Sequence, residues 1–246
     1  MNDALTLTVV YEDPAFLVVD KQADLPTVPL KDDPPEKQTL LSLVSRNYPE
    51  VLSVCGKNIW EGGVLHRLDT ATSGLVVVAR TKDAYASLQS IQKADLFWKE
   101  YTALSSSFKE PELPGFPAYP YENPYVCGGK EVTIGSLFRR YGENRREVRP
   151  VSTDSPRSVL DKSTGTWYTT KVCYSGKTQE GANQFTCRLS SGFRHQVRSH
   201  LAWSGWPLDG DVVYAGIEAP NLALRSVAVR FLHPTTQQQI EIRIDQ

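Results

Sequence analysis

The chain has 246 residues, of which 40% are hydrophobic and 22% charged, and its formal net charge at pH 7 is −1. This composition is typical of a globular chain that buries a core, and it excludes a polycation that binds nucleic acid over its whole surface. The chain has no apolar run of membrane-spanning length, no signal-peptide pattern and no paired cysteine spacing typical of a metal site, so we expect a cytoplasmic protein with four free thiols.

The N-terminal part is predicted to form strands at 5–11 and 16–21 around a Glu-Asp-Pro turn. Five prolines between 22 and 60 predict a loop that holds one short helix at 37–47. A polar turn with a single carboxylate, Asp69, then precedes the apolar run 75–79, which predicts a buried strand. Arg67 puts a positive charge two residues before this carboxylate, and Thr72 supplies a short side chain to the turn.

A helix is predicted at 82–94 and a strand at 98–104, with Lys99 and Tyr101 on one face of the strand. Residues 105–165 are predicted to be irregular, because their prolines exclude long helices. Their basic run is either a solvated mobile loop or an arm that contacts RNA phosphates. It contains Arg139, Arg140, Arg145, Arg146, Arg149 and Arg157.

The C-terminal part is predicted to contain a hairpin of strands at 166–175 and 183–190. A helix follows at about 193–204, closed by Gly205, with Arg194 and Arg198 four residues apart on one face. The alternating segments 222–231 and 240–244 predict two more strands.

The turn around Asp69 resembles the catalytic motif of the RluA-type RNA pseudouridine synthases. That motif reads His-Arg-Leu-Asp, two variable residues and Thr-Ser-Gly-Leu, and residues 66–75 match every fixed position. The pair Asp20-Lys21, the segment Lys99-Glu100-Tyr101, and the C-terminal runs 194–200 and 205–211 resemble further motifs of the same family. Phe193-Arg194 stand where the family has Arg-Thr or Arg-Ser, so either the guanidinium has moved by one position or Phe193 stacks where a cation usually lies. The resemblance covers about residues 9–244 and is loose over 105–160.

The resemblance implies an α+β fold: a mixed, mainly antiparallel sheet flanked by helices, with a central active-site cleft. It implies one catalytic domain over residues 1–246, with no separate N-terminal RNA-binding domain and with 105–160 as a partly basic insert. The implied activity is the isomerisation of uridine to pseudouridine in ribosomal or transfer RNA, on a flipped-out nucleotide. The expected partner is structured RNA, the expected state is a monomer, and no cofactor, metal or membrane is expected.

The resemblance also implies a role for individual residues. Asp69 is expected to act on the ribose as nucleophile or base, Arg198 to keep Asp69 ionised and oriented, and Tyr101 to pack on the uracil and move a proton. The expected substrate-binding residues are Arg67, Thr72, Arg194, His195 and Gln196.

Two other functions fit parts of the sequence. A catalytically inactive RNA-binding or ribosome-assembly factor of the same fold would explain the altered Phe193-Arg194 and the basic insert. A glycoside hydrolase would also use a carboxylate at an anomeric carbon, but it ordinarily needs a second carboxylate, and none accompanies Asp69 nearby in the sequence.

Overall fold

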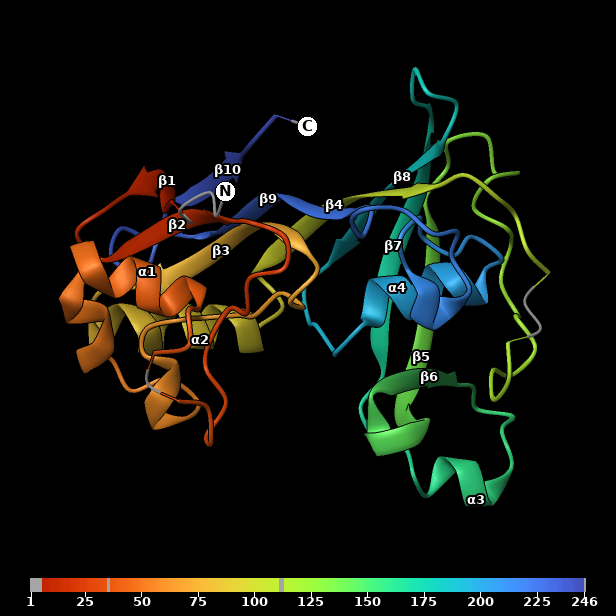
Figure 1. Cartoon of the computed structure of the whole chain (residues 1–246), viewed down its shortest axis with the longest axis horizontal. Helices are drawn as coiled ribbons and strands as arrows, with labels where there is room; N and C mark the ends of the chain where they lie inside the picture. The colour runs from red at the N-terminus through yellow and green to blue at the C-terminus, as the bar shows by residue number, and fades with distance from the viewer. Residues whose placement is uncertain (1–5, 35, 111–112, 246) are drawn as a thin grey trace. The chain divides into compact units, whose positions relative to one another are not determined.

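The chain divides into two compact units in a computed structural model that describes residues 6–34, 36–110 and 113–245. The terminal unit combines Met1–Lys99 with Arg225–Gln246, and the middle unit is Glu100–Leu224. One unit is therefore assembled from both ends of the sequence, as the colours of Figure 1 show, while the other is continuous.

The terminal unit contains a mixed sheet in the order β1-β2-β3-β9, with β10 paired to β9. Its strands are β1 (Thr8–Glu12), β2 (Phe16–Lys21), β3 (Ser73–Ala79), β9 (Leu224–Leu232) and β10 (Gln239–Arg243). The pairs β1–β2, β2–β3 and β9–β10 are antiparallel, and β3–β9 is parallel. The strands β2 and β3 are continuous apolar runs that are almost entirely buried, which is the pattern of strands covered on both faces.

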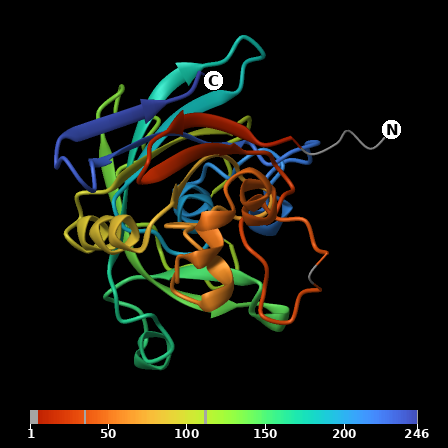
Figure 2. The same ribbon diagram turned by 90° about the vertical axis from the view of Figure 1, so that its left-hand side faces the viewer.

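Two helices cover this sheet and complete its core. Helix α1 (Leu40–Asn47) begins after the Thr39 cap, and α2 (Lys82–Lys93) begins after Thr81, whose hydroxyl accepts a hydrogen bond from Ala84 N. Both helices lie on the same side of β1–β3 in the two views (Figures 1 and 2). The 3₁₀ turns η1 (Pro49–Ser53) and η2 (Ile59–Glu61) connect α1 to the segment that carries Asp69.

The middle unit contains the strand order β4-β8-β7-β5-β6. Its strands are β4 (Trp98–Ser105), β5 (Val132–Tyr141), β6 (Glu147–Val151), β7 (Tyr168–Lys177) and β8 (Asn183–Leu189). The pairs β5–β6, β5–β7 and β7–β8 are antiparallel. Helix α4 (Gln196–Trp203) is buried at all of its positions and makes contacts with β6 and β7. The short elements η3 (Glu143–Arg145), α3 (Arg157–Leu160) and η4 (Val212–Tyr214) lie in the connections.

Most of the predicted elements are confirmed. The hairpin at 166–175 and 183–190 is β7–β8, the tail strands are β9–β10, and the helix at 82–94 is α2. The predicted helix at 37–47 begins only at Leu40, and the strand predicted at 5–11 is β1, with residue 5 outside the described residues. The four cysteines are free thiols. Across the described ranges, no helix is long and apolar enough to span a bilayer.

The prediction of an irregular basic run was wrong for much of its length. Arg139 and Arg140 lie in β5, Arg149 lies in β6, and Arg139 is paired with Arg149 across the two strands. Alternating burial of Val132, Ile134 and Phe138 along β5 gives the run a core-facing side.

The predicted start of the third helix was also wrong. His195 has a left-handed backbone with a φ of 54°, so the helix cannot begin before Gln196. Arg194 therefore lies outside α4 and does not share a helical face with Arg198.

Candidate active site

The turn that carries Asp69 is closed by its own backbone and fixed to the end of β3. The amide of Thr72 donates to the carbonyl oxygen of Asp69 at 3.0 Å, and β3 begins at the next residue. Gly74 has a φ of 111°, and a Cβ atom there would lie 2.2 Å from the carbonyl oxygen of Ser226. Only glycine permits this approach of β3 to β9, so the motif glycine fixes the position at which the turn ends and β3 meets β9.

Thr27 holds the residue before Asp69 by both of its backbone groups. The Thr27 hydroxyl donates to the carbonyl of Leu68 at 2.9 Å and accepts from the amide of Leu68 at 3.2 Å. Thr27 is buried, so these bonds are shielded from water. A loop 41 residues earlier in the sequence thus fixes the approach to the carboxylate.

Lys21 holds the residue after Asp69. Its side chain is fully buried, and its ammonium donates to the carbonyls of Thr70 at 3.0 Å, Leu25 at 2.7 Å and Gln22 at 2.9 Å. Burial lowers the pKa of Lys21 to about 8, against the raising effect of the Asp24 and Asp69 charges. The group is therefore mostly protonated at pH 7, and its positive charge acts on Asp69. From the sequence, Lys21 is predicted to end a strand and is part of the Asp20-Lys21 motif, but no role of its ammonium at Asp69 is predicted.

Arg67 and Thr72, both predicted to bind substrate, have different environments. Arg67 donates to the carboxylate of Glu61 at 3.1 Å while its side chain stays 57% exposed. Glu61 also accepts from the amide of Asn58, so it connects η2 to the motif. Thr72 is buried, and its hydroxyl has no hydrogen-bond partner among the residues the structure describes.

His66, the first residue of the motif, supports β3. Its Nε2 accepts a hydrogen bond from the amide of Val77 at 3.3 Å, and its ring lies 5.5 Å from that of Phe97. Burial first, and then the charge of Lys99, lower the pKa of His66 to about 3. The imidazole is therefore neutral at physiological pH and acts as a fixed acceptor.

Arg198 is bound in the middle unit by a carboxylate that the sequence did not assign a role. Its Nε and Nη2 donate to the two oxygens of Asp211 at 2.7 and 2.8 Å, and both side chains are buried. The Arg198 guanidinium also lies over the Tyr214 ring at 5.4 Å. This bidentate geometry fixes the plane of the guanidinium. Asp211 is the last residue of the run 205–211, and the resemblance of that run to a family motif was the signal that could have identified it.

Tyr101 and His195 take positions that differ in burial. Tyr101 lies on the buried face of β4 together with Lys99, as its alternation predicted. His195 is half-buried, and its Nδ1 lies 3.1 Å from the hydroxyl of Tyr214. That hydroxyl also bonds the backbone of Val148 at 3.1 Å, so Tyr214 ties the start of α4 to β6.

The start of α4 explains the unusual residues at 193 and 194. Phe193 stacks on Phe138 in the core, with ring centroids 5.2 Å apart and planes at 11°. Gln196 accepts from the amide of Phe193 and donates to the Thr169 carbonyl and the Thr170 hydroxyl, so its amide is committed to the protein. Arg194 is exposed, and it donates to the carbonyls of Arg145 and Arg146 at the turn between β5 and β6. The expected pairing of Arg198 with Asp69 joins residues of different units and stays a prediction.

Comparison with known proteins agrees with these motifs. The family model for RNA pseudouridylate synthase matches residues 15–203. Ribosomal large subunit pseudouridine synthase D of Haemophilus influenzae is 28% identical over 96% of this chain and 66% of its own length. The enzyme of the same name from Pseudomonas aeruginosa is 28% identical over 97% of this chain and 63% of its own length. The chain therefore spans slightly less than two thirds of these relatives.

Solved structures show the same fold at low identity. Human RNA pseudouridylate synthase domain containing 1 has a TM-score of 0.67 at 20% identity, covering 100% of this chain and 86% of its own. Human RNA pseudouridylate synthase domain containing 4 has a TM-score of 0.64 at 14% identity, covering 97% of this chain and 88% of its own. The fold is the mixed, mainly antiparallel α+β fold that the sequence predicted. Because the family model matches well over half of the residues, the chain belongs to the RNA pseudouridylate synthase family.

Proposed function

We propose that this protein isomerises uridine to pseudouridine within RNA and that Asp69 acts on the ribose. In this reaction the bond between the ribose and N1 of uracil breaks, the base turns, and a bond from the same ribose carbon to C5 forms. The C5 proton leaves and N1 gains one, so no outside group is transferred. The observation that carries the proposal is the Asp69 turn, which Thr27, Lys21 and β3 hold in one conformation.

Each proposed role is supported by a local arrangement. An attacking carboxylate needs a fixed position, and the buried ammonium of Lys21, which interacts with the Asp69 charge, holds the carbonyl of the next residue. Tyr101 is proposed to pack on a flipped-out uracil and to move the C5 proton, giving up its own hydroxyl proton as it takes that one, and its place on the strand β4 supports a fixed position. Arg198 is proposed to orient Asp69, and the bidentate pair with Asp211 supports a fixed guanidinium plane.

The RNA backbone is proposed to bind at an arginine cluster, defined here as Arg140, Arg145, Arg146 and Arg194. All four are exposed, and no carboxylate among the described residues pairs with any of them. Arg194 brings the cluster together by bonding the backbone of the β5–β6 turn. Guanidinium groups suit phosphate oxygens, so the cluster supports a phosphate-binding surface.

Salt dependence tests the arginine cluster. The double variant Arg145→Gln/Arg146→Gln is expected to reduce the slope of log affinity against log salt by roughly two, since each phosphate contact contributes about one. Arg157→Gln is the matched control, because Arg157 is exposed but pairs with Asp161 at 3.0 Å. An unchanged slope in the double variant would remove the cluster from RNA binding.

The relatives' names favour ribosomal RNA over transfer RNA as the first substrate to examine, since several are called large-subunit synthases. Pseudouridines in ribosomal and transfer RNA from strains with and without the gene are mapped by carbodiimide-dependent primer-extension stops. We expect at least one stop to disappear in the deletion strain. The same stops in both strains would contradict the proposed activity.

Asp69→Asn tests the mechanism at its centre. The change removes the charge with almost no change in shape, so pseudouridine formation is expected to be lost while the fold and RNA affinity are kept. Asp154→Asn, an exposed carboxylate on another loop, is the control and should stay active. Full activity of Asp69→Asn would exclude this carboxylate from the reaction.

An inactive RNA-binding or assembly factor is the second candidate, favoured by the arginine cluster and by the partly buried Phe193, which packs against the core at Phe138. A deletion strain complemented with Asp69→Asn separates the two. Normal ribosome profiles without pseudouridine would favour the binding role.

A further inference from the structure

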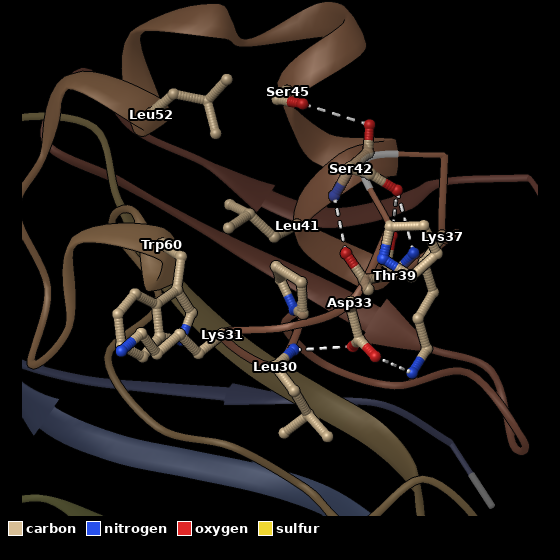
Figure 3. A pocket seen from close by; sticks show the side chains of 12 residues that line it. Leu30, Lys31, Asp33, Lys37, Thr39, Leu41, Ser42, Ser45, Leu52 and Trp60 are labelled. Carbon is tan, nitrogen blue, oxygen red and sulfur yellow. Dashed lines mark hydrogen bonds and ion pairs between the residues drawn. The ribbon is translucent and has the colours of Figure 1, made fainter.

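The terminal unit has a pocket of about 350 Å³ that the proposed reaction does not use. It lies between the loop that begins at Pro29, helix α1 and the segment up to Trp60 (Figure 3). Its main lining side chains are Leu30, Lys31, Leu41, Ser42, Leu52 and Trp60. A volume of this size suits one small ring system with its substituents.

Apolar side chains at this pocket are unusually exposed. Leu30 is 65% and Leu52 55% exposed, and Trp60 is half-buried. In Figure 3 the side chain of Leu41 is drawn between the indole of Trp60 and Leu52. Exposed leucines around an aromatic ring favour a ligand with a flat, weakly polar body.

The polar groups of the pocket are mostly committed to the protein. The Ser42 hydroxyl accepts from the Thr39 amide and donates to the Thr39 carbonyl, and the Ser45 hydroxyl donates to the Ser42 carbonyl. These hydroxyl groups therefore shape the wall of the pocket and offer few free hydrogen-bonding sites to a ligand.

The loop charges are also partly committed. Asp33 accepts from the amide of Leu30 at 2.7 Å and the ammonium of Lys37 at 2.8 Å, and these two bonds lower the pKa of Asp33. Two donors remain: within the described residues, neither the Lys31 ammonium nor the Trp60 indole N–H has a hydrogen-bond acceptor. A matching ligand is a flat ring that carries hydrogen-bond acceptors and an attached negative charge, which is the chemistry of a nucleotide.

Two short links join the pocket to the Asp69 turn. Glu61 directly follows Trp60 and binds Arg67, two residues before Asp69. Thr27, just before the pocket loop, holds Leu68 by two hydrogen bonds. A nucleotide in the pocket would therefore lie on the same polypeptide framework as the catalytic turn.

We propose that this pocket binds an unstacked nucleotide of the substrate RNA, distinct from the target uridine. Its base packs between Trp60 and the leucines, and its phosphate pairs with Lys31. Flipping a target base disrupts the stacking of its neighbours, and a second aromatic platform offsets that loss. The inference rests on the proposed function, because it takes RNA as the substrate.

Fluorine NMR of protein labelled with 5-fluorotryptophan tests the pocket directly. The chain has five tryptophans, and Trp60→Phe identifies the Trp60 resonance. Titration with uridine, cytidine, adenosine and guanosine monophosphates is expected to shift this resonance with saturation. Lys31→Gln should weaken binding of the monophosphates about tenfold and leave that of the free nucleosides unchanged. Lys57→Gln, an exposed lysine outside the lining, is the charge control.

RNA kinetics give the second readout. Leu52→Glu places a charge where the base would pack, and is expected to raise KM about tenfold with kcat unchanged, the size of one lost stacking contact. Ile59→Glu is the matched control, because Ile59 is 77% exposed and does not line the pocket. Both substituted side chains are exposed, so equal melting temperatures are expected.

The two proposals fail in distinguishable ways. The pocket assignment is overturned if the Trp60 resonance does not shift with any nucleotide. It is also overturned if the resonance shifts with protein concentration alone, because a second copy of the chain then occupies the pocket. An unchanged KM in Leu52→Glu also overturns it, even in an active enzyme. A Trp60 response in a protein that makes no pseudouridine keeps the pocket and removes the proposed reaction.

Discussion

Replacing Lys21 by methionine is expected to lower the activity strongly while changing the stability of the fold only slightly. Methionine keeps most of the side-chain volume and removes the ammonium that holds the Thr70 carbonyl beside Asp69. The Asp69 turn then loses its buried cation and one of its three anchors. We expect kcat to fall about a hundredfold, a loss typical of a misplaced catalytic group.

The effect of this change on stability is small because two terms oppose each other. The pKa of Lys21 falls from 10.5 to about 8, so the fold disfavours the charged group by about 3 kcal/mol, which methionine recovers. The buried Leu25 carbonyl loses its donor, at a cost of about 1–3 kcal/mol, and the two partly buried carbonyls lose less. The free energy of unfolding at pH 7 should therefore change by less than about 2 kcal/mol.

In the unchanged protein, stability and activity are expected to respond to pH in opposite directions. Between pH 8 and 10.5 the unfolded chain holds more protons at Lys21 than the folded chain, so this group makes the fold more stable as pH rises. Activity should fall over the same range, since Asp69 loses its cation. Lys99 is the control, because burial also lowers its pKa to about 8.

The assays are urea unfolding and initial rates of pseudouridine formation between pH 6 and 10. The alkaline loss of activity should vanish in Lys21→Met and persist in Lys99→Met. A Lys21→Met enzyme with native kcat, or an alkaline loss that disappears only in Lys99→Met, would refute the reasoning.

Three further predictions concern other buried groups. Asp211→Asn leaves Arg198 without its anionic partner and should lower the free energy of unfolding by about 3 kcal/mol together with kcat; an unchanged urea midpoint would contradict this. Burial lowers the pKa of His200 to about 3, so the free energy of unfolding should fall as pH drops from 6.5 towards 3. In urea titrations at pH 4–7, His200→Gln should reduce the dependence of the free energy of unfolding on pH. Gly74→Ala would bring its Cβ within 2.2 Å of the Ser226 carbonyl and should cost about 3 kcal/mol or more; a native melting temperature would show that β3 and β9 can separate freely.

The periodicity of apolar residues correctly predicted those helices and strands that are determined by their own local sequence. The β7–β8 hairpin, the β9–β10 hairpin and α2 have regular apolar spacing and clear turn or cap residues, and all three were predicted. The prediction for the basic run failed because the burial of Arg149 depends on tertiary packing, in part against Phe116 and Tyr214, which are distant in sequence. Its guanidinium lies over the rings of Phe116, Tyr141 and Tyr214 and pairs with Glu147. No composition rule separates such an arginine from a solvated one.

The candidate site shows the same limit. The ordered motif located Asp69, but the groups that fix its turn act across long separations, 49 residues for Lys21 and 41 for Thr27. The pair of Arg198 with Asp211 spans 13 residues and crosses the end of α4. A left-handed backbone at His195 has no signal in the sequence, because a non-glycine residue adopts it only under tertiary constraint.

The parallel pairing of β3 with β9 has a consequence for biosynthesis. During translation the nascent N-terminal segment leaves β3 as an open sheet edge until the whole middle unit has been made, because β9 follows that unit. The motif glycine meets its partner carbonyl only then. Premature termination before residue 225 would therefore release a chain in which β3 and the Asp69 turn lack the support of β9.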